Sequence, residues 1–160
     1  MSSTSVNVRT TPADIEELLE IETLKGIMAR YARFGETGDW ASFRALFTED
    51  FTYRADAAPR ASADASPVIA VEGRDAFVGA METLLDGVVA VHQIALPEVT
   101  LTSATTARSV WAIHDYVKTP KVGTFKGWGH ITQQYVKIDG EWKIRSSHTT
   151  RTLVEEEWAS

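Results

Sequence analysis

The stretch KGWGHITQQYVKIDGEWKIRSSHTTRTL, residues 126–153, decides the fold class of this chain. Apolar and polar residues alternate on both sides of Asp139-Gly140, as they do in two half-buried strands. An Asp-Gly dipeptide favours the backbone of a two-residue hairpin turn. Counting back from this turn predicts three cross-strand pairs: Tyr135 with Ile144, Gln133 with Ser146, and Ile131 with His148.

This register assigns the two histidines of the hairpin to opposite faces. His148 shares the apolar face, whereas His130 lies on the other face with Val136 and Arg145. A bulge in the hairpin would reverse this assignment. His148 is therefore a candidate site residue, and His130 a candidate interface residue.

Two more segments rich in β-branched and aromatic residues, about 88–102 and 106–118, precede the hairpin. Pro97 interrupts the first segment and predicts a bulge or bend there. The second segment presents Trp111, Ile113 and Asp115 on one face and Ala112, His114 and Tyr116 on the other. We expect Asp115 to face inward because it follows the bulkier apolar stripe, and His114 is the alternative.

Three helices are predicted before these strands. The first begins at Thr11-Pro12, where Thr11 can cap the helix, and it continues to about Gly35. Gly38-Asp39 favours a helix stop and a new cap before a short helix over 40–47. A third helix begins at Gly73. The residues expected to face the core from the first and third helices are Ile15, Leu18, Ile21, Leu24, Met28, Tyr31, Phe77, Met81, Leu84 and Leu85.

Short strands are expected at 51–54, which carries Tyr53, and at 68–71. Between them, residues 56–68 are rich in Ala, Ser and Pro and have no apolar period, so we expect a loop that could act as a flap over a cavity. Helices followed by long antiparallel strands indicate an α+β fold. We expect a bent, cone-shaped sheet wrapped around the long first helix, with the two further helices on the same face.

The chain is expected to form one domain over residues 13–154, with tails at 1–12 and 155–160. The net charge is -6 and no run of Lys or Arg occurs, which argues against nucleic acid or a membrane surface as a partner. There is no cysteine, and hence no disulfide or thiolate site. Because no apolar run has the length of a signal peptide core or a membrane span, we expect a cytoplasmic protein.

The order of elements and several short motifs resemble the SnoaL-like branch of the nuclear transport factor 2-like superfamily, which has a cystatin-like α+β barrel. The motifs are RYA at 30–32, GDW at 38–40, LFTEDF at 46–51, VEGRDAF at 71–77, SVWAIHDY at 109–116, GWGH at 127–130 and DGEWKIRS at 139–146. The resemblance covers about residues 13–154. Proteins with this fold have many activities, so the resemblance indicates the fold more specifically than the function.

Within the superfamily, the chain looks most like the scytalone dehydratase and bile-acid dehydratase type. By this resemblance, the catalytic residues are Tyr31, Glu36, Tyr53 and His92, together with His114 or Asp115. Glu36 departs from the family pattern, which more often has aspartate at that position. Histidine suits proton transfer because its ordinary pKa lies near neutrality.

The sequence and the resemblance together predict a lyase, in the first place a dehydratase, acting on a hydrophobic cyclic or aromatic hydroxylated molecule. His92, oriented by Asp115, would remove a proton, and Tyr31 with Tyr53 would hydrogen-bond the developing oxyanion or the leaving hydroxyl. A carbon–carbon lyase would use the same groups. The alternatives are an isomerase or cyclase, and a non-catalytic binding protein or accessory subunit of an oxygenase.

No cofactor or metal is expected. The histidine spacing matches no recurrent metal-ligand motif, Gly127-Trp128-Gly129 lies inside a strand pattern, and no phosphate-binding loop occurs. A bent sheet covers only its concave face with helices. We therefore expect a homo-oligomer, a dimer or trimer, that buries the convex face, with Trp128, Val136 and Ile138 among its possible members.

Overall fold

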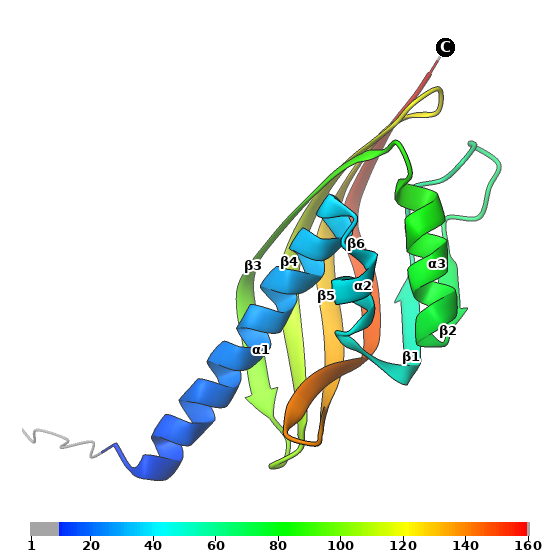
Figure 1. Cartoon of the computed structure of the whole chain (residues 1–160). Coiled ribbons are helices and arrows are strands. Elements are labelled where there is room, and N and C mark those ends of the chain that lie inside the picture. The colour runs from blue at the N-terminus through cyan, green and yellow to red at the C-terminus, as the bar shows by residue number, and fades with distance from the viewer. Residues whose placement is uncertain (1–9, 160) are drawn as a thin grey trace, which may run out of the picture.

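The computed structural model describes residues 10–159, so most of the expected N-terminal tail lies outside the described residues. In this range the chain forms three helices and six strands (Figure 1). The helices are α1 (Pro12–Thr37), α2 (Trp40–Arg44) and α3 (Arg74–Leu85). The strands are β1 (Phe47–Ala55), β2 (Ile69–Glu72), β3 (Val89–Leu101), β4 (Thr106–Thr119), β5 (Gly123–Ile138) and β6 (Glu141–Trp158).

One mixed sheet with the order β2-β1-β6-β5-β4-β3 curves around the helices. Neighbouring strands are antiparallel except β1 and β6, which are parallel. The sheet does not close, and the three helices lie on its concave side (Figure 1). The predicted α+β cone is therefore confirmed. Residues 155–158, expected to be a tail, continue β6.

Capping interactions fix the ends of α1. The hydroxyl of Thr11 accepts a hydrogen bond from the backbone N–H of Asp14, whose carboxylate accepts one from the backbone N–H of Thr11. Gly38 ends the helix in the left-handed conformation, with φ of 69°.

The first turns of α1 do not reach the core, contrary to the prediction from the apolar stripe. Ile15 and Leu18 are 50% and 57% exposed, whereas Leu24 and Met28 are almost fully buried. The cause is the length of α1, because its N-terminal half extends past the edge of the sheet (Figure 1). Leu84 of α3 was also expected in the core, but it is 41% exposed at the cavity described below.

The β5–β6 hairpin has the predicted turn but a different register beyond it. Asp139 and Gly140 both have positive φ, and Tyr135 pairs with Ile144 as expected. One residue further along, the register shifts at a bulge. The observed pairs are Gln133 with Ser147 and Ile131 with Thr149, so the two predicted pairs Gln133–Ser146 and Ile131–His148 are wrong.

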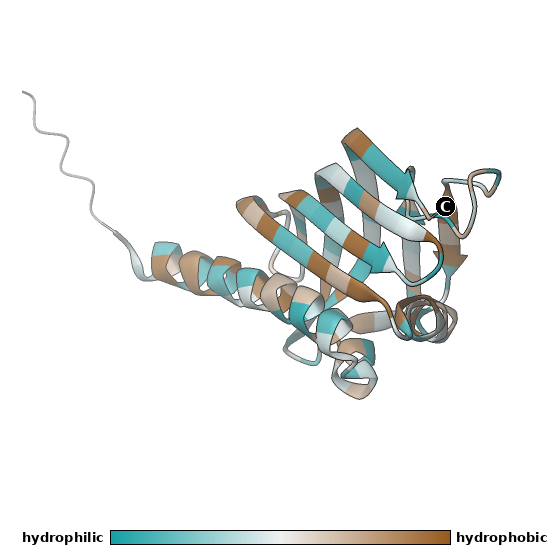
Figure 2. Cartoon of the chain, turned by 90° about the horizontal axis from the view of Figure 1, so that it is seen from above, coloured by the Kyte–Doolittle hydropathy of each residue, from teal (hydrophilic) through white to brown (hydrophobic). Residues whose placement is uncertain are grey.

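This bulge exchanges the faces of β6, because side chains alternate across a strand. Ser147 and Thr149 are buried on the concave face, whereas His148 lies on the opposite face and is half-exposed. Figure 2 shows the alternation of polar and apolar residues along the strands. Pro97 has the predicted effect in β3, where the register shifts between Ala95 and Glu98.

The convex face carries exposed apolar side chains, among them Ile138 and Leu153. The expected homo-oligomer stays a prediction. Within residues 10–159, no helix has the length and apolar character needed to cross a membrane.

A buried hydrogen-bond chain joins β4 and β5 inside the aromatic core. The Trp111 indole donates to the Ser109 hydroxyl at 2.7 Å, and the Tyr135 hydroxyl donates to the Gln133 carbonyl at 2.5 Å. Ser109 Oγ lies 2.9 Å from Tyr135 Oη and completes the chain. Burial raises the pKa of Tyr135 to about 12, although the hydrogen bonds from Ser109 and Trp111 favour the ionised form.

The raised pKa of Tyr135 predicts that the protein loses stability at alkaline pH. The Tyr135 hydroxyl has a higher pKa in the folded state than in the unfolded state. Its contribution to the free energy of unfolding is therefore fully present below pH 10.0 and is lost as the pH rises towards about 12. The free energy of unfolding should fall by about 3 kcal/mol over that range on account of Tyr135. Urea unfolding at several pH values measures it. An equally steep fall in Tyr135→Phe would contradict the assignment.

Candidate active site

A cavity lies between the concave face of the sheet and the helices α1 and α3, with about 820 Å³ of empty space including its open mouth. Most of its lining is apolar, with side chains such as Phe43, Met81 and Leu85. The polar residues of the lining are Tyr31, Tyr53, His92, Asp115, Thr119 and Arg151. An apolar chamber with a few converging polar groups is the usual form of a small-molecule site.

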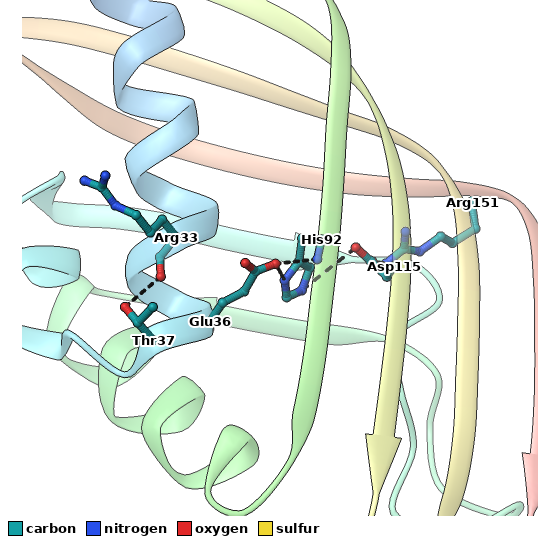
Figure 3. Close-up of polar contacts among 6 residues, drawn as sticks. All are labelled: Arg33, Glu36, Thr37, His92, Asp115 and Arg151. Atoms are coloured by element: carbon teal, nitrogen blue, oxygen red, sulfur yellow. Dashed lines mark hydrogen bonds and ion pairs between the residues drawn. The ribbon is translucent and has the colours of Figure 1, made fainter.

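His92 belongs to β3, and its ring lies between Glu36 of α1 and Asp115 of β4 (Figure 3). Its Nδ1 lies 3.3 Å from Oε1 of Glu36, which is in the last turn of α1. The same carboxylate oxygen accepts a hydrogen bond from the backbone N–H of His92. On the other side of the ring, Nε2 lies 3.9 Å from Oδ1 of Asp115. The ring is thus placed between two carboxylates, and the contact with Glu36 is the shorter one.

Asp115 is the more buried carboxylate and is paired with Arg151 (Figure 3). Their side chains are 6% and 7% exposed, and Arg151 Nη2 donates to Asp115 Oδ2. Arg151 Nε also donates to the backbone carbonyl of Ala57, at 3.2 Å. Oδ1 of Asp115 has no hydrogen-bond partner and is therefore left to face His92.

Gly127 makes room for this ion pair. It lies opposite Asp115 in the register of β4 and β5. A Cβ atom at Gly127 would come within 2.7 Å of the Phe125 ring and 3.1 Å of the Arg151 guanidinium carbon. Arg151 also lies over the Phe125 ring, at 5.6 Å from its centroid. A side chain at residue 127 would therefore force the Phe125 ring to shift and would crowd the guanidinium that pairs with Asp115.

Tyr31 from α1 and Tyr53 from β1 supply the hydroxyl groups of the lining. Tyr31 packs on Phe43, and Tyr53 packs on Phe77, at centroid distances of 5.3 Å and 4.7 Å. Burial raises the pKa of both tyrosines, and for Tyr31 the rise is large. The negative charge of Asp115 raises the pKa of both tyrosines further. Both hydroxyls therefore stay protonated and can donate hydrogen bonds at neutral pH.

The remaining histidines lie outside the cavity. His114 stacks on Trp128 on the convex face, with ring centroids 4.6 Å apart, and its Nδ1 faces Gln93. His148 Nε2 lies 2.8 Å from Asp56 on the same face, and His130 is exposed. Of the predicted site residues, the structure brings Tyr31, Glu36, Tyr53, His92 and Asp115 together, and it leaves His114 and His148 apart.

Sequence reasoning missed Arg151. The bulge turns this residue inward, and no pattern in the sequence located the bulge. The glycine at residue 127, inside a long strand, was a usable signal, because such glycines often mark a close approach of another group. Among residues 10–159, no three histidine, aspartate or glutamate side chains gather in a way that could hold a metal ion.

A family model described as a SnoaL-like domain matches residues 16–148. A comparison with curated proteins found no match.

Solved structures show the same fold. A putative scytalone dehydratase from Novosphingobium aromaticivorans is 18% identical, with a TM-score of 0.73, over 90% of this chain and 91% of that one. A hexachlorocyclohexane dehydrochlorinase from Novosphingobium barchaimii is 9% identical, with a TM-score of 0.74, over 90% and 94%. A protein of unknown function from Mycobacterium tuberculosis is 22% identical, with a TM-score of 0.71, over 88% and 76%.

The space left by Gly127 is testable with a matched pair of variants. Gly127→Ala should destabilise the fold by roughly 1–3 kcal/mol, because its methyl group meets Phe125 and Arg151. Gly79→Ala in α3 has no atom within 4 Å of its new methyl group and should be stabilised by about 0.5–1 kcal/mol. Denaturant unfolding measures both, and a Gly127→Ala variant as stable as Gly79→Ala would contradict the packing described.

Proposed function

We propose that this chain, which belongs to the SnoaL-like domain family, is a lyase that acts on a hydrophobic cyclic or aromatic hydroxylated molecule without a cofactor. A dehydratase is the first form of this proposal. The observation that carries it is the placement of His92, whose ring lines an apolar cavity and is flanked by Glu36 and Asp115.

The contacts of His92 favour one tautomer. Because the Glu36 carboxylate is an acceptor, it favours the proton on Nδ1 and leaves a lone pair on Nε2. That lone pair can take a proton from a substrate carbon next to a carbonyl or another electron-withdrawing group. The imidazolium formed in this step would then be stabilised by Asp115 Oδ1, 3.9 Å from Nε2. Glu36 thus takes the orienting role that the sequence analysis gave to Asp115.

Elimination completes the reaction. As His92 takes the proton, the electron pair of the C–H bond forms a double bond, and the bond from the neighbouring carbon to its hydroxyl breaks. The imidazolium returns the proton to the leaving hydroxyl, which departs as water. Tyr31 and Tyr53 would donate hydrogen bonds to the developing oxyanion or to the leaving oxygen, a role that suits hydroxyls that stay protonated.

Two of the similar structures are named for eliminations, one a putative scytalone dehydratase and the other a hexachlorocyclohexane dehydrochlorinase. At 9–18% identity these structures show the fold alone, so the chemistry rests on the residues of this chain. A carbon–carbon lyase remains compatible with the same base and donors. An isomerase or cyclase would give a product of unchanged mass, which mass spectrometry distinguishes from dehydration.

A non-catalytic binding protein or oxygenase subunit is the alternative outside enzymes. That hypothesis predicts His92 and Asp115 too far apart to interact. The separation of 3.9 Å lies within the range of an ion pair once the imidazole is protonated, and this favours the catalytic proposal.

The role of His92 can be tested against a histidine on the other face of the sheet. His92→Ala should lower kcat by roughly 10²–10⁴-fold with the fold retained, because the base is removed. His114→Ala, on the convex face, should keep nearly wild-type turnover and serves as the control. A screen of hydroxylated ring ketones would first identify a substrate, and the kcat of both variants would then be measured with that substrate. A folded His92→Ala variant with near wild-type turnover would exclude this mechanism.

A further inference from the structure

The connection between β1 and β2 supplies part of the cavity wall. Its residues Ala58 and Pro59 are part of the cavity lining, and Ala58 is only 4% exposed. At its base, the backbone N–H of Asp56 donates to the carbonyl of Thr149, and the N–H of Ala58 donates to the carbonyl of Pro67. These bonds define a loop closed on itself over residues 57–67, called the lid below.

The outer part of the lid is fastened to the end of β6 by Arg60. Its guanidinium forms a two-pronged ion pair with Glu156, through Nε and Nη2. The side chains are 20% and 18% exposed, so solvent screens this pair less than an exposed one. The guanidinium also lies over the Trp158 ring, at 5.1 Å from its centroid.

The inner part of the lid is fastened to the site itself. Arg151 donates through Nε to the carbonyl of Ala57 and through Nη2 to Asp115, so one guanidinium contacts both the lid and a carboxylate beside His92. Opening of the lid would break the first of these bonds. The position of the lid and the environment of Asp115 are therefore linked through Arg151.

The tip of the lid is attached within the lid by Arg60, whose Nη1 donates to the backbone carbonyl of Ala63. Residues 61–64 are small or polar and exposed. Few buried apolar contacts are typical of a segment that opens locally at low free-energy cost. Apart from the backbone bonds at its base, the lid is joined to the rest of the chain by the contacts of Arg60 and Arg151.

We propose that residues 57–67 form a gate to the cavity, held shut by the contacts of Arg60 with Glu156 and Trp158, and that ligands enter and leave when this latch opens. Closure excludes water from His92 and Asp115 and restores the contact between Arg151 and Ala57. This inference does not depend on the reaction proposed above, because it concerns the exchange of any apolar ligand that the cavity holds.

The latch can be opened by a single substitution. Arg60→Gln keeps most of the side-chain length but removes the charge, so association and dissociation of the uncharged fluorophore N-phenylnaphthylamine should both become roughly tenfold faster, with little change in Kd. Arg44→Gln, which breaks an ion pair with Asp75 away from the lid, is the matched control and should leave both rates unchanged. Stopped-flow fluorescence measures the rates. Equal rates in Arg60→Gln and Arg44→Gln would overturn the proposal.

The latch can also be locked, because the chain has no native cysteine. In the double variant Arg60→Cys and Glu156→Cys, a bis-methanethiosulfonate linker would tie the lid to β6, and a thiol reductant would release it. The bridged protein should exchange the fluorophore at least tenfold more slowly than the same protein after reduction. Exchange at the same rate before and after reduction would show that ligands bypass the lid and would overturn the proposal.

Discussion

The one-residue bulge in β6 is the constraint on which the site depends. Side chains alternate across a strand, so a shift of one residue exchanges the faces of the residues that follow, here as far as a second register shift just beyond Arg151. Here it turns Ser147, Thr149 and Arg151 towards the helices and sends His148 to the convex side. With the opposite faces, Asp115 would be buried without a cation, and a buried unpaired carboxylate costs several kcal/mol.

The ion pair of Asp115 and Arg151 gives the two carboxylates near His92, Glu36 and Asp115, different roles. Oδ2 of Asp115 is occupied by Arg151, which fixes the side chain and leaves Oδ1 towards the imidazole. Glu36, at the end of α1, contacts the other ring nitrogen and ties the helix to β3. One carboxylate thereby orients the ring, and the other is positioned to stabilise the charge that proton transfer creates.

Local signals in the sequence sufficed for most of the fold. The cap at Thr11, the stop at Gly38, the bend at Pro97 and the turn at Asp139-Gly140 each act through a few neighbouring residues, and each appears in the structure. The inward orientation of Asp115 was expected from the bulkier apolar stripe that it shares with Trp111 and Ile113, and Asp115 is buried.

Long-range features were not available from the same patterns. The bulge in β6 depends on how that strand pairs with both β5 and β1, so the faces of His148 and Arg151 could not be derived from alternation alone. The exposure of Ile15 and Leu18 depends on the length of α1 relative to the sheet, and an apolar stripe does not report that length. The contact between Glu36 and His92 likewise joins elements that are distant in the sequence.

The tautomer of His92 decides whether the imidazole can act as the proposed base, because the base needs its lone pair on Nε2. Nitrogen NMR of the protein with isotope-labelled histidine distinguishes the two neutral tautomers by the shifts of the ring nitrogens, and His92→Gln assigns the signal. We expect a proton on Nδ1, facing Glu36, and an unprotonated Nε2 in the neutral ring. A neutral His92 with its proton on Nε2, donated towards Asp115, would rule out Nε2 as the proposed base.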